Sequence, residues 1–151
     1  MVGDFELPSI VDELLRAGTW PTHNSDYVSR ASEHLVRAVL ADESCFCLLA
    51  PPFRTLEQDE NISQNLWWKN WLEGFRHPSE IDYSKAVMVA DFGPGSENPI
   101  VLDYRSSPPQ VMALTVRFHR EAPNSARGEW EGHWVVLAST LEELLDKLGL
   151  P

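Results

Sequence analysis

The chain has 151 residues, of which 43% are hydrophobic and 23% are charged, and this is the size and composition of one ordinary globular domain. Its formal net charge of −11 argues against a nucleic-acid partner and against an anionic membrane, because phosphate groups would repel it. The same charge favours basic partners, although it can also serve only to keep a protein soluble. No run approaches the roughly 18 apolar residues of a membrane span and no secretory signal opens the chain, so we expect a soluble, cytoplasmic protein.

Two helices are predicted in the first third of the chain. Residues 8–17 carry an apolar stripe at helical spacing, with a proline in the first turn and Gly18 at the end. Residues 26–41 carry a second stripe of this kind, and Ser25 or Asp26 would cap that helix.

A short apolar run at residues 45–50 predicts a buried strand. Cys45 and Cys47 are separated by one residue and would point to opposite faces of the strand, so a disulfide between them is not expected. We expect both to be small buried hydrophobic residues in a reducing compartment.

An acidic segment and an aromatic helix follow. Residues 53–66 predict an exposed loop that leads into a helix at residues 64–76, where aromatic side chains recur at helical spacing. We expect Trp67, Trp71 and Phe75 to pack inward and Trp68 to be half-exposed. Because tryptophan is enriched in binding hot spots, part of this cluster and the acidic loop form a predicted partner surface. Its residues are Glu57, Asp59, Glu60, Trp67, Trp68 and Trp71.

The rest of the chain predicts strands and a closing helix. Four apolar runs separated by turn-forming segments predict an antiparallel meander. They lie at residues 86–92, 100–104, 111–118 and 134–137. Residues 139–149 predict a helix with a capping box at Ser139 or Thr140 and a stop at Gly149. Helices, then strands, then a helix indicate one α+β domain over residues 1–151, with an antiparallel or mixed central sheet flanked by helices.

Several motifs of the second half follow one another as an ordered set between Val87 and Leu148. A strand runs into a glycine-containing turn at residues 90–96, a hydrophobic strand at 99–104 leads into an aspartate, and a Pro-x-Val strand and a Ser-Thr-Leu-Glu-Glu helix come after it. This set resembles the SMI1/KNR4 family, also called the SUKH superfamily. The resemblance gives a structural role to its motif residues, which are Asp91, Gly93, Gly95, Asp103 and Trp134.

The resemblance also implies a function. Bacterial members of the family are viewed as immunity proteins that bind and neutralise toxins, many of them nucleases with basic surfaces, and fungal members act as regulatory scaffolds in cell-wall glucan synthesis. We therefore expect a non-enzymatic immunity protein that binds a basic toxin domain. A regulatory scaffold, and a small-molecule-binding protein or enzyme, are the alternatives.

Two motifs could carry chemistry instead. Asp91 and Asp103 flank the predicted hairpin and could form a catalytic carboxylate pair, but hydrogen bonds to turn amides or across the hairpin are the favoured interpretation. Gly93 and Gly95 resemble a phosphate-binding loop, which would also need a lysine and a following helix that this sequence does not offer.

The histidines do not follow a metal-binding pattern in sequence. His119 and His133 could meet on neighbouring strands and bind a metal ion, but no third ligand accompanies them, and ordinary surface histidines are expected. No catalytic residue, cofactor or metal is therefore predicted.

Overall fold

A computed structural model describes residues 2, 4–23, 31–92, 98–118 and 130–150. Within them the chain forms five α-helices, one short 3₁₀ helix and one five-stranded sheet. The helices are α1 (Ser9–Arg16), α2 (Glu33–Val39), α3 (Leu56–Ile62), α4 (Leu66–Gly74), η2 (Tyr83–Lys85) and α5 (Leu141–Lys147). The strands are β1 (Cys47–Leu48), β2 (Ala86–Asp91), β3 (Pro99–Asp103), β4 (Gln110–Phe118) and β5 (Trp130–Ala138).

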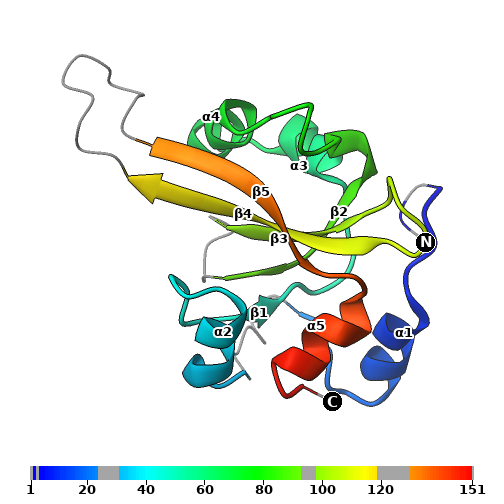
Figure 1. Cartoon of the computed structure of the whole chain (residues 1–151). Helices are drawn as coiled ribbons and strands as arrows, with labels where there is room; N and C mark the ends of the chain where they lie inside the picture. Colours follow the sequence, from blue (N-terminus) through cyan, green and yellow to red (C-terminus); the bar gives the residue numbers. More distant parts are fainter. Residues whose placement is uncertain (1, 3, 24–30, 93–97, 119–129, 151) are drawn as a thin grey trace.

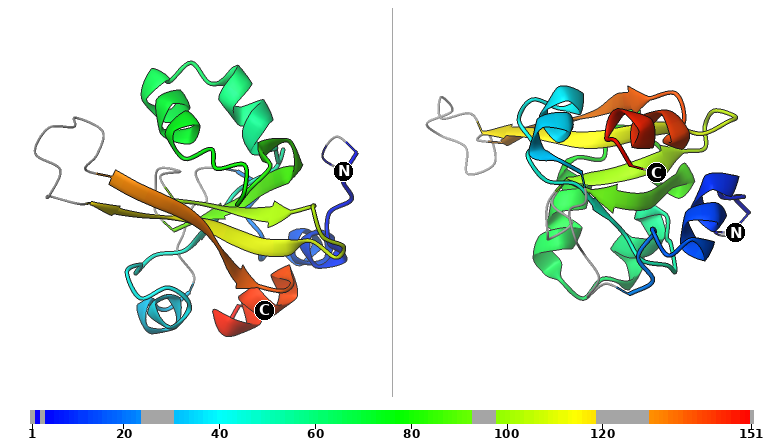
Figure 2. Two further views of the ribbon diagram at one scale, coloured as in Figure 1. Left: turned by 45° about the horizontal axis from the view of Figure 1, so that its top comes forward. Right: turned by 90° about the horizontal axis from the view of Figure 1, so that it is seen from below.

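The sheet has the strand order β1-β2-β3-β4-β5, and every neighbouring pair is antiparallel. Helices α1, α2 and α5 lie on one side of it, and α3 and α4 lie on the other (Figures 1 and 2). The predicted α+β class and the antiparallel meander are confirmed. No helix among the described residues combines the length and the hydropathy needed to cross a bilayer.

Strands β2 and β3 are buried on both faces, which explains why their side chains are nearly all apolar. In β3, Ile100 and Leu102 join the core under α1, α2 and α5, while Val101 between them joins the core under α3 and α4. In β2, Val89 is an extra residue between two register positions, a β-bulge that turns the following residue back to the first core. A strand covered on both faces needs apolar side chains at every position.

The N-terminal arm is tied to the far end of the β2–β3 hairpin. The Phe5 ring stacks on the Tyr104 ring with centroids 4.7 Å apart. The Tyr104 hydroxyl donates a hydrogen bond to the Glu6 carbonyl oxygen over 2.7 Å. Helix α1 follows this contact and ends where Gly18 adopts a φ of +73°, as its sequence predicts.

The prediction for residues 26–41 was wrong in its extent. Helix α2 begins only at Glu33, and its N-cap is Ser32, whose side chain accepts a hydrogen bond from the Leu35 amide over 3.3 Å. The caps expected at Ser25 and Asp26 lie outside the described residues. Tyr27, Val28 and Ala31 continue the apolar spacing of the helix on the N-terminal side of Ser32, and this extended the predicted helix beyond its true cap.

The predicted exposed loop at residues 53–66 was also wrong, because α3 lies within it. Thr55 accepts a hydrogen bond from the Gln58 amide, and the Gln58 side chain accepts one from the Thr55 amide, over 3.1 and 3.0 Å. This capping box starts the helix, and the buried Leu56 anchors it to the sheet. Because α3 has only one buried residue in seven, its sequence shows no apolar repeat from which a helix could be predicted.

The C-terminal half follows its sequence more closely. Strand β5 is longer than the predicted 134–137, since it starts at Trp130. Helix α5 is capped by Thr140, which accepts from the Glu143 amide, and the Glu143 carboxylate accepts from the Ser139 amide. Gly149, with a φ of +69°, ends the helix as predicted.

Candidate functional site

An exposed apolar patch lies where α3 leads into α4. Ile62, Leu66 and Trp67 expose 55%, 73% and 53% of their surface, and we call these three residues the α3–α4 patch. Val136 on β5, at 55%, completes the set of exposed large hydrophobic residues in the described part of the chain. Single exposed apolar residues are ordinary on protein surfaces, but here three lie within six positions of the chain.

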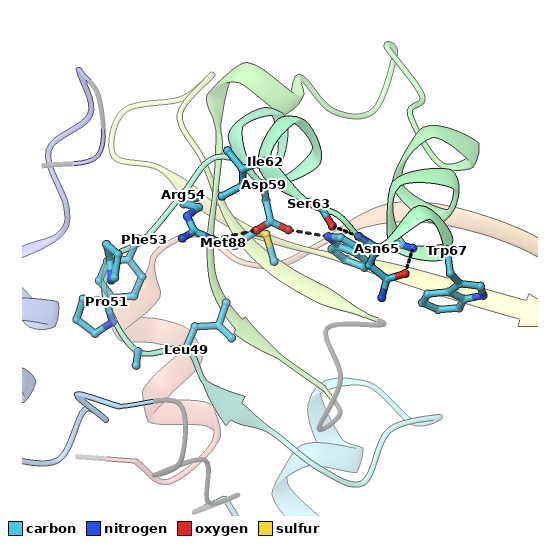
Figure 3. A pocket seen from close by; sticks show the side chains of 13 residues that line it. Leu49, Pro51, Phe53, Arg54, Asp59, Ile62, Ser63, Asn65, Trp67 and Met88 are labelled. Carbon is cyan, nitrogen blue, oxygen red and sulfur yellow. Dashed lines mark hydrogen bonds and ion pairs between the residues drawn. The ribbon is translucent and has the colours of Figure 1, made fainter.

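An open cavity of about 480 Å³ adjoins the patch. Trp67 stands at one end of the cavity, Pro51 and Phe53 at the other, and Met88 of β2 between them (Figure 3). Its wall is formed by α3, by the start of α4 and by the segment that follows β1. The cavity is therefore lined by apolar and polar side chains that belong to separate elements of the fold.

Asp59 is the acidic group inside this cavity. Its Oδ2 accepts a hydrogen bond of 2.6 Å from the Trp68 indole Nε1–H, and its Oδ1 lies 3.5 Å from Nη1 of Arg54 (Figure 3). The carboxylate thus joins α3 to α4 and holds one guanidinium at the cavity edge. Asp59 therefore makes contacts within the fold, in addition to being one of the predicted partner-binding residues.

The orientation predicted for the tryptophans was wrong. Trp68 is buried, with 7% of its surface exposed, and Trp67 is the exposed one. The hydrogen bond to Asp59 draws Trp68 inward, so this depends on α3, the helix that the sequence did not predict. Trp71 is half-buried and stacks on Trp67 with ring centroids 5.1 Å apart, while Phe75 is buried as predicted.

The other predicted acidic residues have different surroundings. Glu57 is exposed on α3. Glu60 is half-buried, and its Oε1 lies 2.7 Å from Nη2 of Arg76, whose guanidinium also lies over the Tyr83 ring at 4.4 Å from the centroid. Glu60 thus belongs to a contact that joins α3, α4 and η2. Of the three predicted acidic partner residues, Glu57 is the one whose carboxylate faces solvent.

Asp103 is fully buried and has the structural role that the hairpin pattern predicted. Its carboxylate accepts hydrogen bonds from the Arg105 amide and guanidinium, at 2.9–3.0 Å for the shortest, and one of 3.1 Å from the Gln110 side chain. Burial raises the pKa of Asp103, but these hydrogen bonds outweigh it, and the pKa is lowered. The group is held ionised inside the protein.

Asp91 and Asp103 do not meet. Asp103 pairs with Ala86 at one end of the hairpin, and Asp91 lies five residues further along the same strand. At about 3.3 Å per residue the two positions are on the order of 16 Å apart, too far for a catalytic pair. Asp91 is buried. Gly93 and Gly95 lie outside the described residues.

Trp134, the last of the motif residues, is a buried residue of β5. Its indole Nε1–H donates a hydrogen bond of 3.0 Å to the Phe75 carbonyl oxygen at the end of α4. Its ring meets the Tyr83 ring edge-on at 6.0 Å. Trp134 therefore connects the sheet to the helical layer that carries the patch.

The cysteines differ, which corrects the prediction that both are buried. Cys47 is buried in β1, whereas Cys45 is exposed. Burial raises the pKa of the Cys47 thiol, and the charge of Asp91 adds to that effect. Cys45 lies before β1, and residues i and i+2 of a regular strand share a face, so the expectation that strand alternation would point the two side chains to opposite faces was wrong.

Thiol labelling of the native protein should therefore modify Cys45 rapidly and Cys47 slowly, because thiolate character and access decide reactivity. Titration with a chromogenic disulfide should find one fast thiol in the native state and two in denaturant. A Cys45→Ser variant should lose the fast phase. Two equally fast thiols in the native protein would contradict the burial of Cys47.

A second cluster of polar side chains lies beyond the end of α4. Its members are His77, Glu80, Glu131 and His133. His133 contacts both carboxylates, with Nε2 3.0 Å from Oε1 of Glu131 and Nδ1 3.0 Å from Oε2 of Glu80. Hydrogen bonds with Glu131 and then Glu80 raise the pKa of His133. Sequence spacing offered no signal for this cluster, which forms through contacts between segments more than fifty residues apart.

Comparison of the chain with protein-family models, with curated proteins and with solved structures found no match in any of the three.

Proposed function

We propose that this chain is a non-enzymatic binding protein that contacts a basic protein partner through the α3–α4 patch. The exposure of Ile62, Leu66 and Trp67 beside an open cavity is the observation that supports this most directly. An exposed aromatic anchor with apolar neighbours and a polar rim is the usual centre of a protein interface. Trp67 already stacks on Trp71, which limits the side-chain entropy that binding would cost it.

The partner that we propose is a toxin domain, which the protein would neutralise by direct contact in the cytoplasm. This rests on the resemblance of residues 87–148 to the SMI1/KNR4 family and on the net charge of −11. A nuclease toxin carries a positively charged substrate surface, and an acidic protein is attracted to such a surface over long range. In the same proposal, Glu57, which is exposed on α3, contributes to that attraction.

A capture experiment tests the proposal. The protein serves as bait for lysate of its source organism and for the products of neighbouring genes, and captured proteins are identified by mass spectrometry. A stoichiometric partner that is toxic when expressed alone and harmless when co-expressed would support toxin neutralisation. A housekeeping partner would favour the regulatory scaffold, and binding of a metabolite in the cavity would favour the small-molecule alternative.

Trp67→Ala is expected to weaken binding of the captured partner by about 2 kcal/mol or more, roughly 30-fold, as for a hot-spot tryptophan. Because Trp67 is 53% exposed, the variant should unfold at nearly the same denaturant concentration as the parent. Val136→Ala is the matched control, since Val136 is 55% exposed but lies on β5. Equal affinities of the two variants, measured by calorimetry, would place the interface elsewhere.

The association rate should depend on salt. Raising the ionic strength from about 50 to 500 mM shortens the Debye length from about 14 to 4 Å, which screens attraction between an acidic protein and a basic partner. We expect the association rate to fall by about tenfold or more and the dissociation rate to change little. Stopped-flow mixing measures both, and a salt-independent association rate would remove the role of charge from the proposal.

A further inference from the structure

The turn that follows α4 is attached to β5 at two points. Within the turn, the amides of Glu80 and Ile81 both donate to the His77 carbonyl oxygen, over 2.9 and 3.0 Å. His77 Nε2 lies 2.8 Å from the Gly132 carbonyl oxygen, and Glu80 Oε1 accepts from the Trp134 amide over 3.2 Å. These contacts bring two side chains of the turn to the face of β5 that carries His133.

The three side chains are close enough to share one ion. His77, Glu80 and His133 each offer one ligand atom, and these atoms lie within 4.8 Å of one another. Two ligands of a tetrahedral zinc ion with bonds of about 2.0–2.1 Å are about 3.3 Å apart. His133 Nδ1 and Glu80 Oε2, at 3.0 Å, are already near that separation. Of the three side chains, His133 is exposed and His77 and Glu80 are half-buried, and small side-chain rotations would bring the ligand atoms to the remaining separations.

Both imidazole rings are held in the manner of metal ligands. A metal-bound histidine usually gives its other ring N–H to a carboxylate or a backbone carbonyl. Here His77 Nε2 faces the Gly132 carbonyl oxygen at 2.8 Å, and His133 Nε2 faces Oε1 of Glu131 at 3.0 Å. With Nε2 carrying the proton in each ring, the lone pair is on Nδ1 in both.

We propose that His77, Glu80 and His133 form a binding site for a zinc-type transition-metal ion, with Nδ1 of each histidine and Oε2 of Glu80 as ligands and water in the fourth position. Two imidazoles and one carboxylate suit Zn²⁺, whereas Mg²⁺ and Ca²⁺ prefer oxygen ligands alone. Two groups that are not ligands orient the rings: Glu131 orients the His133 ring, and the Gly132 carbonyl orients the His77 ring. The site is separate from the α3–α4 patch, and it does not depend on the proposed partner.

The ion would link the segment after α4 to β5. That segment already receives a hydrogen bond from Trp134 at the Phe75 carbonyl oxygen, so the metal would reinforce a junction between the two layers of the fold. An ion that binds the folded state and not the unfolded chain raises the melting temperature in proportion to the logarithm of its concentration. In the alternative arrangement no ion binds. His133 Nδ1 then carries a proton and donates a hydrogen bond to Glu80.

The test is titration of the metal-free full chain with ZnCl₂ by calorimetry and with CoCl₂ by visible absorption. We expect one ion per chain, intense visible bands typical of tetrahedral cobalt, and a higher melting temperature with Zn²⁺. His133→Ala and His77→Ala should each weaken zinc binding by at least about 100-fold, and Glu131→Gln by about tenfold or more. Two control variants should bind as the parent does: His34→Ala, because His34 is an exposed histidine on α2, and Cys45→Ser, which removes the exposed thiol.

Two results would overturn the proposal. One is the absence of saturable binding of either ion up to about 1 mM. The other is zinc binding that His77→Ala and His133→Ala leave unchanged. If an alanine variant does not fold, Glu80→Gln replaces it, because its amide oxygen can still accept from the Trp134 amide while it is a poorer zinc ligand. In the parent, imidazole proton signals that do not shift on adding Zn²⁺ would exclude these ligands.

Discussion

Asp103→Ala is expected to lower the free energy of unfolding by about 3–5 kcal/mol, the usual cost of removing one partner of a buried ion pair. The carboxylate is fully buried between β3 and β4. Its removal leaves the Arg105 guanidinium, whose side chain is only 32% exposed, without its ionic partner, although the hydrogen bond to the Glu80 carbonyl oxygen remains. The Gln110 side-chain amide loses its acceptor as well.

Denaturant unfolding at neutral pH measures this loss. Asp146→Ala is the control, since Asp146 is exposed in the last turn of α5, and its removal should change stability by less than about 0.5 kcal/mol. A loss below about 1 kcal/mol for Asp103→Ala would mean that the fold hardly depends on this carboxylate.

The stability difference between the parent and a second variant, Asp103→Asn, should depend on pH with a fixed sign. The pKa of Asp103 is lowered in the folded protein, so ionised Asp103 adds stability above its unfolded pKa of about 4. That contribution is lost as the pH falls from about 4 through the lower folded value. The difference between parent and Asp103→Asn should therefore be largest near neutral pH and shrink in acid. A difference that stays constant between about pH 7 and pH 2 would contradict the lowered pKa.

Gly132→Ala is the second substitution with a large expected effect. A Cβ atom at this position would lie 2.5 Å from Cε1 of the Phe75 ring and would meet Cδ1 as well. Phe75 is 7% exposed and packs edge-on against Trp71, so the ring has little room to move. We expect a loss of about 1–3 kcal/mol, the range for overpacking a core.

Gly74→Ala, at the end of α4, is a matched control for Gly132→Ala. Gly74 ends α4, and a Cβ atom there would meet nothing within 4 Å. Gly74→Ala should therefore be neutral or stabilising by up to about 1 kcal/mol, since alanine favours a helix over glycine. Phe75→Leu should recover part of the stability lost in Gly132→Ala. If Gly132→Ala and Gly74→Ala have the same free energy of unfolding, the Phe75 ring moves aside without a loss of stability.

Strands β2 and β3 were predictable because both are buried on both faces. The run at 86–92 is apolar except for Asp91, and turn residues separate such runs. The meander follows directly, since short connections between such strands make neighbours of consecutive ones. The capping box and the glycine stop of α5 were equally local signals.

The arrangement of the candidate sites was not predictable in the same way. Which of Trp67 and Trp68 is exposed depends on Asp59, nine residues from Trp68, and on a helix that only Leu56 anchors. The contacts between Glu80 and His133 join residues 53 apart in sequence. Periodicity describes one element at a time, whereas these features arise where separate elements pack together.

The contact between the N-terminal arm and Tyr104 has a kinetic consequence. The hydrogen bond from Tyr104 to Glu6 closes a loop between residues 98 apart in sequence, whereas β2, β3, β4 and β5 pair with their neighbours along the chain. Closing the larger loop costs more chain entropy, so we expect the arm to dock after the meander has formed. Interactions made after the folding transition state slow unfolding and leave the folding rate nearly unchanged. We therefore expect the stacked pair of Phe5 and Tyr104 to lengthen the lifetime of the folded chain by slowing its unfolding.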